Sequence, residues 1–326
     1  MKYEVRVEDA VGMVLAHDLT KIVAHEFKGT IFHKGHIISG ADIPELLKIG
    51  KERIYVLKLE LGEVHEDDAA LRMAEVLKHE SLMFTDPHEG KVIVKAAHAG
   101  LLTIDTARLA TLNQIGELMV VTKRTHTYVK QSDKVAGLRV IPLIAQEEKL
   151  TTFKAIAQPA PLIEIKPFRK MSVGIVTTGS EVFYGRIQDR FGPVVTEKLA
   201  QYEKVLVLSQ TIVNDNQEDI VAAIRSFIDR GADLVLVTGG MSVDPDDRSP
   251  AAIKTVADHV VSYGMPILPG SMTMLAYAGP VVLMGLPGGV IYDPFTAFDL
   301  LLPQIMAGVR PTAADIAALG HGGMLS

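Results

Sequence analysis

The chain has 326 residues, of which 48% are hydrophobic and 22% charged, a composition typical of globular domains that excludes a largely disordered protein. Its formal net charge of −6 argues against a general nucleic-acid binder, which needs a basic surface. The absence of cysteine excludes disulfides and thiolate chemistry. The charged N-terminus and the lack of an apolar run near roughly 18 residues argue against a signal peptide and a membrane span, so we expect a soluble cytoplasmic protein.

Two small modules are predicted before a proline-rich segment. Residues 1–80 mix short extended runs with helical patterns, which predicts an α+β module. Residues 81–157 show short apolar runs between turn signals, and Val92–Val94 predicts one strand of a β-rich module. The segment 158–167 contains three prolines, which cannot continue a helix or a central strand. We interpret it as a linker.

The remaining residues, 168–326, predict an α/β domain with three layers and a mostly parallel sheet. Apolar runs rich in branched residues alternate there with helical patterns, as expected for buried parallel strands that are covered by helices. The clearest helical pattern spans Gln217–Arg230, with Ile220, Ile224 and Phe227 at spacings of three and four. Gly231 follows as a predicted helix C-cap.

Ligands of such sheets bind outside the carboxyl ends of the strands, so the loops after the apolar runs are candidate sites. The first loop, Thr177–Glu181, contains small hydroxyl residues around Gly179 that let the backbone approach a phosphate or a ring. A tight turn with a helix cap explains the same residues without any ligand. In the second loop, Asp215 and Asn216 precede the predicted helix and are explained by helix capping alone.

The third loop follows Gly239-Gly240 and is rich in charged residues, with Asp244, Asp246, Asp247 and Arg248 within five positions. A solvated turn explains one or two acids, whereas adjacent carboxylates beside a Gly-Gly pair suit a phosphate site assisted by Mg²⁺. Ser249-Pro250 then predicts a helix start. The fourth loop, Leu286–Gly289, follows another buried strand and exposes backbone N–H groups.

These four loops, in this order, resemble the molybdopterin-binding domain that is shared by molybdopterin molybdotransferases, molybdopterin adenylyltransferases and gephyrin. The resemblance rests on TTGSE with a following G-x-I-x-D, on TGGMS and on GLPG, and it covers Met171–Gly308. It implies molybdopterin or its adenylylated form as ligand, Mg²⁺ as metal, and ATP or molybdate as further reactants. It also implies a homo-oligomer, because the resembling proteins form dimers or trimers.

The loops and the resemblance together predict the site residues. Asp246 and Asp247 are the predicted catalytic residues and Mg²⁺ ligands. The predicted ligand-binding residues come from all four loops and their flanks, and they are Thr178, Gly179, Ser180, Glu181, Asp189, Asp215, Gly239, Gly240, Ser242, Ser249, Pro287 and Gly288.

The third loop combines features of several branches of this family. Asp247 falls on an acidic position that the branches share, and Ser249-Pro250 is comparable to a Thr-Pro pair of the adenylyltransferases. The pair Asp246-Asp247 resembles the competence-damage-inducible proteins, some of which hydrolyse pyridine-nucleotide pyrophosphates. Met241-Ser242-Val243 is closest to the molybdotransferases. The loop therefore does not select one branch.

Three departures from the molybdotransferase pattern bear on catalysis. Arg190-Phe191 replaces the Ser-Asn pair that follows the aspartate corresponding to Asp189, and Gly289 replaces the Asn of Leu-Pro-Gly-Asn-Pro. The chain also ends at Ser326, from which we expect no further C-terminal β-domain.

Three functions remain open from the sequence. The first is Mg²⁺-dependent nucleotidyl or molybdate transfer on molybdopterin. The second is a non-catalytic carrier or sensor of the pterin that serves a molybdoenzyme, and the third is a nucleotide pyrophosphatase. None of them involves a nucleic acid or a membrane.

Several other residues are explained more simply by structure than by chemistry. His33 and His36 lack a third ligand nearby in sequence, so we interpret them as part of a surface turn rather than a metal site. His88 and His98 are interpreted as loop residues. Met272 and Met274 are expected in the core, and no G-x-S-x-G motif indicates a nucleophilic serine.

Overall fold

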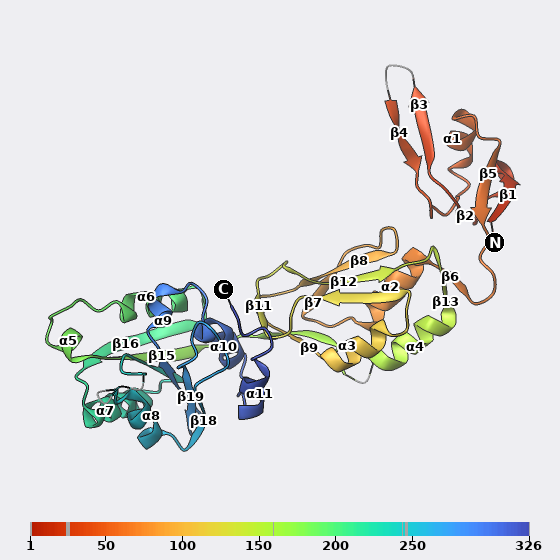
Figure 1. Ribbon diagram of the computed structural model, residues 1–326. Helices are drawn as coiled ribbons and strands as arrows, with labels where there is room; N and C mark the ends of the chain where they lie inside the picture. The colour runs from red at the N-terminus through yellow and green to blue at the C-terminus, as the bar shows by residue number, and fades with distance from the viewer. Residues whose placement is uncertain (1, 24–26, 159, 243, 245–246, 326) are drawn as a thin grey trace. The chain divides into compact units, whose positions relative to one another are not determined.

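The computed structural model describes residues 2–23, 27–158, 160–242, 244 and 247–325 (Figure 1). The chain divides into two compact units, one formed by Met1–Thr125 with Val129–Ile165 and the other by His126–Tyr128 with Lys166–Ser326. None of the helices in the described ranges is long and apolar enough to cross a bilayer.

The N-terminal unit begins with a small α+β part around a hydrophobic cluster that includes Leu15, Ile38, Leu46 and Val56. Its strands form a three-stranded sheet in the order β1-β5-β2 and a hairpin of β3 with β4. The elements are β1 (Lys2–Arg6), the 3-10 helix η1 (Val7–Asp9), β2 (Val14–Leu15), β3 (Leu19–Val23), β4 (Phe27–Phe32), α1 (Ile43–Lys48) and β5 (Arg53–Leu57).

The rest of this unit packs around a second cluster, with an antiparallel sheet in the order β10-β12-β8-β7. The elements are β6 (Glu63–His65), α2 (Glu66–Val76), β7 (Leu82–Phe84), β8 (Lys91–Ala96), β9 (Gly100–Ile104), α3 (Thr106–Asn113), β10 (Leu118–Thr122), β11 (Thr127–Val129), β12 (Lys134–Val140), β13 (Ile144–Gln146), α4 (Glu147–Ala157) and β14 (Ile163–Pro167). Thr127 and Tyr128 of β11 and the last two residues of β14 belong to the C-terminal unit.

Two elements of this part differ from the modules expected from sequence. Helix α2, which falls within the expected first module, packs into the second cluster through Ala69, Met73 and Ala74. Helical periodicity shows that a face is apolar, but not which core receives it. Strand β14 occupies the second half of the expected linker, and its Ile163 and Ile165 are buried. Proline at the start or end of a short strand costs no central ladder bond.

The C-terminal unit contains a six-stranded sheet in the order β16-β15-β17-β20-β19-β18. Strands β16, β15, β17 and β20 are parallel, whereas β19 pairs antiparallel with β20 and β18. This arrangement confirms the predicted α/β fold with a mostly parallel sheet. The strands are β15 (Met171–Thr178), β16 (Val205–Val213), β17 (Leu234–Thr238), β18 (His259–Tyr263), β19 (Met274–Ala278) and β20 (Val281–Leu286).

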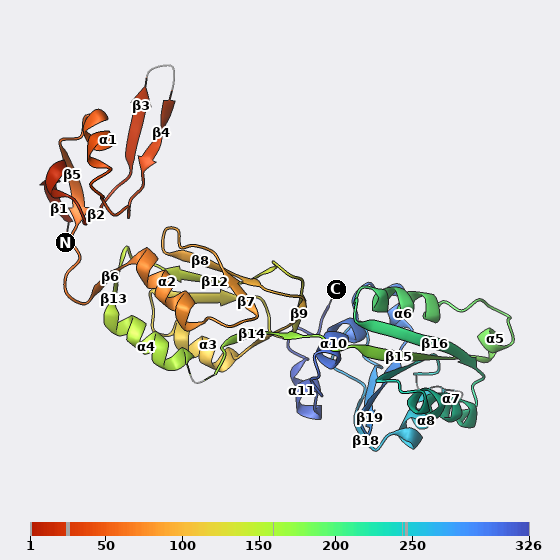
Figure 2. The same ribbon diagram turned by 180° about the vertical axis from the view of Figure 1, so that it is seen from behind.

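Helices cover both faces of this sheet. Figures 1 and 2 show α7 and α8 along one face, with α6 and α9 on the other. The helices are α5 (Ser180–Phe183), α6 (Phe191–Ala200), α7 (Gln217–Asp229), α8 (Ser249–Val256), α9 (Gly289–Tyr292), α10 (Ala297–Met306) and α11 (Ala313–Ala318).

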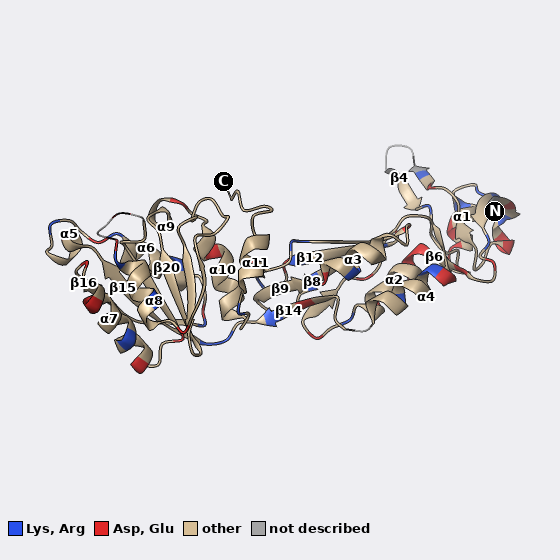
Figure 3. Ribbon diagram, turned by 60° about the horizontal axis from the view of Figure 1, so that its bottom comes forward, with Lys and Arg blue, Asp and Glu red and all other residues tan. Residues whose placement is uncertain are grey.

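Helix α7 follows its sequence signals closely. The Asn216 side chain accepts a hydrogen bond from the Glu218 N–H at 2.9 Å, which caps the first turn. Ile220, Ile224 and Phe227 are buried, and Gly231 follows with a φ of 80°, as expected at a helix C-cap. In Figure 3, red and blue segments of α7 show its acidic and basic residues.

We predict that the fragment Lys166–Ser326 folds by itself. It contains a cluster of buried side chains from the sheet, α7 and α8, which supplies a core of its own. It lacks Tyr128, whose ring centroid lies 5.5 Å from that of Phe168 and 5.2 Å from that of Tyr202. Losing these ring contacts should lower the free energy of unfolding by about 1 kcal/mol. Urea unfolding followed by circular dichroism should show one cooperative transition, and a broad non-cooperative loss of signal would contradict this prediction.

A second prediction concerns the contact between β15 and α7. A Cβ at Gly174 would lie 2.3 Å from the Phe227 ring, and Phe227 is buried. Gly174→Ala should therefore destabilise the unit by about 1–3 kcal/mol, as overpacking does. Gly288→Ala is the matched control, because nothing lies within 4 Å of its Cβ position. Equal unfolding midpoints for the two variants would show that Phe227 does not pack as described.

Candidate functional site

The predicted loops gather at the carboxyl end of the parallel sheet. β15 lies between β16 and β17. The chain leaves β15 toward β16 on one side and leaves β17 toward β18 on the other side. Ligands of α/β sheets bind at such a switch point. The loops after β15 and β17 begin at Gly179 and Gly239. The loops after β16 and β20 begin at Asn214 and Pro287.

The ends of β15 and β17 approach each other very closely. A Cβ at Gly239 would lie 2.2 Å from the Thr178 backbone oxygen, and Gly239 has a φ of 87°. Only glycine meets both conditions without strain. Gly240 follows with a φ of 53°, so two consecutive left-handed residues turn the chain away from the sheet.

Ser249 stabilises this turn through two hydrogen bonds. Its side chain is fully buried, and its Oγ donates a hydrogen bond to the Gly239 carbonyl oxygen at 2.8 Å. The Ser249 N–H also donates to the Gly240 carbonyl oxygen at 3.3 Å. Ser249 therefore holds the loop in place and does not line the pocket described below.

A chain of hydrogen bonds runs beneath the loops. Thr238 Oγ1 lies 3.0 Å from Thr177 Oγ1, which also accepts from Gln210 Nε2 at 2.8 Å. The same Gln210 nitrogen lies 2.6 Å from Asp189 Oδ2. Asp189 in turn accepts from the N–H groups of Phe191 at 2.8 Å and Gly192 at 3.1 Å. Asp189 thus satisfies the first two N–H groups of α6 and is absent from the pocket lining.

A pocket of about 850 Å³ lies between the four loops. It is lined by ten of the predicted site residues, which are Thr178, Gly179, Glu181, Asp215, Gly239, Gly240, Ser242, Asp247, Pro287 and Gly288. Ser180, Asp189 and Ser249 are not among the lining residues, and Asp246 falls outside the described residues. The four loops therefore share one cavity.

Asp215 links the first two loops. Its Oδ2 accepts a hydrogen bond from the Ser180 N–H at 2.6 Å, so the loop after β16 holds the start of α5. Ser180 contributes its backbone to this contact, while Asp215 remains partly exposed in the pocket.

Tyr263 of β18 positions the third loop. Its hydroxyl lies within hydrogen-bonding distance of the Met241 carbonyl oxygen at 3.1 Å and the Ser242 carbonyl oxygen at 3.0 Å. Burial, followed by the negative charge of Asp247, raises the pKa of the Tyr263 hydroxyl. The phenol therefore stays protonated and can donate to the loop.

The other wall of the pocket comes from α9 and from the loop that precedes it. Ile291 and Tyr292 line the pocket. Nearby, the buried Lys198 of α6 donates to the Asp293 and Pro294 carbonyl oxygens at 3.3 and 2.7 Å, and to Asp299 Oδ2 at 2.7 Å. These bonds satisfy a buried ammonium group and fix the end of α9.

Sequence reasoning missed part of the lining. Met272, Ile291 and Tyr292 line the pocket without belonging to a motif, and Met241 lines it although its motif was read for its neighbours. Met272 was expected in the core, where only Met274 is fully buried. Arg190 and Phe191 stood out in the sequence as departures, and both line the pocket.

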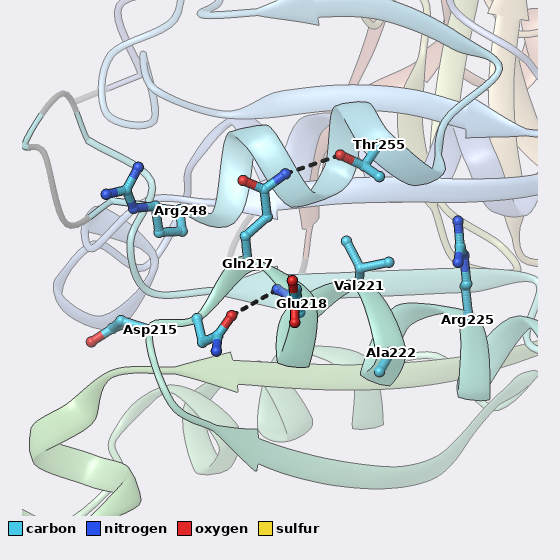
Figure 4. Close-up of a pocket in the computed structure, with 9 residues that line it drawn as sticks. Asp215, Gln217, Glu218, Val221, Ala222, Arg225, Arg248 and Thr255 are labelled. Carbon is cyan, nitrogen blue, oxygen red and sulfur yellow. Dashed lines mark hydrogen bonds between the residues drawn. The ribbon is translucent and has the colours of Figure 1, made fainter.

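A second groove of about 780 Å³ runs between α7 and α8 and shares Asp215 with the pocket. Figure 4 shows Arg248 and Arg225 toward its two ends and Gln217 between the helices. Gln217 Nε2 donates to Thr255 Oγ1 at 3.1 Å, which joins the helices across the groove. No sequence pattern had indicated it.

The histidines interpreted as surface residues have structural partners. A ring nitrogen of His36 lies 2.8 Å from Asp42 Oδ2, and His33 lies 3.9 Å from Asp18. The described part of the chain holds no group of three or more His, Asp or Glu side chains arranged to bind a metal by themselves.

Comparison with family models identifies two segments of the chain. Residues 174–307 match a model described as a probable molybdopterin binding domain. Residues 4–58 match a domain of unknown function, DUF8806, and they coincide with the first part of the N-terminal unit.

Curated relatives and a solved structure also resemble part of this chain. A molybdopterin molybdenumtransferase from Synechococcus elongatus is 28% identical over 177 residues, which are 51% of this chain and 44% of that protein. A CinA-like protein from Mycobacterium tuberculosis is 40% identical over 76 residues, which are 23% of this chain and 17% of that protein. The crystal structure of the molybdopterin biosynthesis enzyme MoaB from Thermus thermophilus has 26% identity and a TM-score of 0.37, and the match covers 43% of this chain and 98% of that one.

The matched regions span less than half the length of these curated relatives. The family model nevertheless covers all four strand-end loops and the pocket that they form. The resemblance inferred from the loop motifs is thereby confirmed. Residues 174–307 of this chain form a domain of the molybdopterin-binding family of molybdenum cofactor biosynthesis.

Proposed function

We propose that this domain binds molybdopterin or its adenylylated form and catalyses Mg²⁺-dependent nucleotidyl or molybdate transfer on it. The observation that supports this proposal is the shared pocket, in which ten residues predicted from four separate loops line one cavity. Its volume of about 850 Å³ is within the range of small-molecule sites.

Backbone groups of the glycine loops are suited to bind the phosphate of such a ligand. Gly179, Gly239 and Gly240 line the pocket, and their lack of side chains lets a ligand reach the main chain. Phe191 and Tyr292 also line it and offer apolar rings against which a flat pterin can pack. In this proposal the rings hold the pterin and the loops hold its phosphate.

The acidic residues of the third loop fit a metal that is shared with the ligand. Mg²⁺ often takes only one or two carboxylates when substrate phosphates complete its ligands. Asp247 and Asp244 both line the pocket, and the Asp244 N–H donates to Asp247 Oδ2 at 3.2 Å. Asp247 and Asp246 would hold Mg²⁺ next to the phosphates, where the cation would stabilise charge that develops on a phosphate oxygen.

Binding and turnover can be tested separately. Isothermal titration of the full chain with molybdopterin should show binding, and its absence at tens of micromolar would refute the proposal. Transferase activity should appear either as pyrophosphate release with Mg²⁺, ATP and molybdopterin, or as conversion of adenylylated molybdopterin in the presence of molybdate.

A non-catalytic carrier is the second candidate, because Arg190 and Phe191 lie in the pocket lining where the molybdotransferase pattern has small polar residues. Binding without turnover in both assays would favour the carrier. Hydrolysis of a pyridine-nucleotide pyrophosphate with a divalent metal would instead favour a pyrophosphatase. That function is suggested by the resemblance of the pair Asp246-Asp247 to the competence-damage-inducible proteins.

Asp247→Asn should keep the fold and lower Mg²⁺-dependent turnover by on the order of a thousandfold, because a ligand charge next to the reacting phosphate is lost. Asp246→Asn is the companion variant. Asp229→Asn is the control, since Asp229 is exposed at the far end of α7 and outside the pocket. Wild-type turnover in Asp247→Asn would exclude Asp247 as a metal ligand.

Tyr263→Phe should weaken molybdopterin binding about three- to tenfold, because the Met241 and Ser242 carbonyl oxygens lose a donor worth about 1 kcal/mol. The loop that carries Asp247 then becomes less ordered. Tyr184→Phe is the control, because Tyr184 is 60% exposed and does not line the pocket. Calorimetric titration of both variants tests this, and equal affinities would show that the Tyr263 hydroxyl does not order the loop.

A further inference from the structure

The charge of the pocket is unusual for a site that receives an anionic ligand. Four acidic residues line it, Glu181, Asp215, Asp244 and Asp247, whereas Arg190 is the one basic residue among the described lining residues. A phosphate placed there is repelled by the carboxylates unless a positive group lies close to it. Arg190 is the positive group that the described lining supplies.

The N-terminus of α6 does not meet this need, although Arg190 immediately precedes it. The Phe191 and Gly192 N–H groups already donate to Asp189, and Pro193 has no N–H. The free donors that make a helix start attractive to anions are therefore mostly taken. This leaves the guanidinium of Arg190 as the donor for a phosphate on this side of the pocket.

The backbone of Arg190 is held in place while its side chain is exposed. Asp189 bonds to the two residues that follow Arg190 and also to Gln210, which fixes the backbone on both sides. Arg190 takes part in none of the ion pairs found among the described residues. Its planar fork of donors suits two phosphate oxygens at once.

We propose that Arg190 binds the phosphate of the ligand and makes the pocket selective for a phosphate monoester over its neutral parent compound. The inference rests on the proposed function for the pterin part of the ligand. It also gives a role to a residue that the sequence marks as a departure from the molybdotransferase pattern, since a cation replaces a small polar side chain at the rim.

The test compares a charged and a neutral ligand on the full chain. The probes are hydroxymethylpterin, its phosphate monoester and AMP, titrated by fluorescence or calorimetry. The wild-type chain should bind the pterin phosphate at least tenfold more tightly than the neutral pterin. Arg190→Gln should weaken binding of the phosphate ester about 10- to 100-fold and leave binding of the neutral pterin within about twofold, and Arg190→Lys should retain part of the preference.

Arg186→Gln is the matched control, because it changes the net charge equally in the same segment. The Arg186 guanidinium lies 5.3 Å from the Tyr184 ring centroid, and Arg186 does not line the pocket. The Arg186→Gln variant should prefer the phosphate ester over the neutral pterin as strongly as the wild type does. Circular dichroism of each variant shows whether the fold is kept, and Arg190→Lys carries the test if Arg190→Gln fails to fold.

The outcomes separate this inference from the proposed function. An unchanged phosphate preference in Arg190→Gln, or an equal loss in Arg186→Gln, would overturn the role of Arg190 while leaving pterin binding intact. If neither pterin binds, the proposed function fails. If AMP alone binds, and Arg190→Gln abolishes its binding, the role of Arg190 is supported with a nucleotide as the source of the phosphate.

Discussion

The site depends on the contact between the ends of two neighbouring parallel strands. Thr177 of β15 and Thr238 of β17 are register partners, both fully buried, and the chain after Thr238 passes so close to the Thr178 carbonyl that Gly239 has no room for a side chain. Because the connections after the two strands leave in opposite directions, the space between their loops remains open. The pocket is a consequence of this local crowding and of the order of the strands.

Polar residues around the pocket divide between two tasks. Asp189, Ser249 and Tyr263 satisfy backbone groups of α6 and of the loop after β17, so they hold the loops that carry the ligand-facing residues. Asp247 and Glu181 face the pocket. A residue of the first kind affects binding through the position of its loop, and a residue of the second kind affects it through its own charge.

The charge of the pocket connects its geometry to the proposed chemistry. An excess of carboxylates in a partly enclosed cavity raises the electrostatic cost of an anionic ligand, and this cost falls when a cation is bound with the ligand. In the proposed function, the same carboxylates that repel a free phosphate would therefore favour a phosphate that arrives with Mg²⁺. Arg190 adds a fixed positive charge from a different loop, so in these proposals Mg²⁺ and Arg190 would both offset the repulsion between the carboxylates and the phosphate.

Sequence alone determined the alternation of strands and helices after residue 168, the start of α7 at Gln217 and the four loops, because hydrophobic periodicity, caps and glycines are local signals. Tertiary structure decided which residues share the cavity. Asp189 and Ser249, polar residues in the right motifs, are used to hold backbone, while Tyr292 and Met272 reach the pocket without any motif. It also decided that α2 joins the second hydrophobic cluster and that β18 and β19 extend the sheet antiparallel. These outcomes depend on pairings between segments that are distant in the sequence, and local patterns carry no information about such pairings.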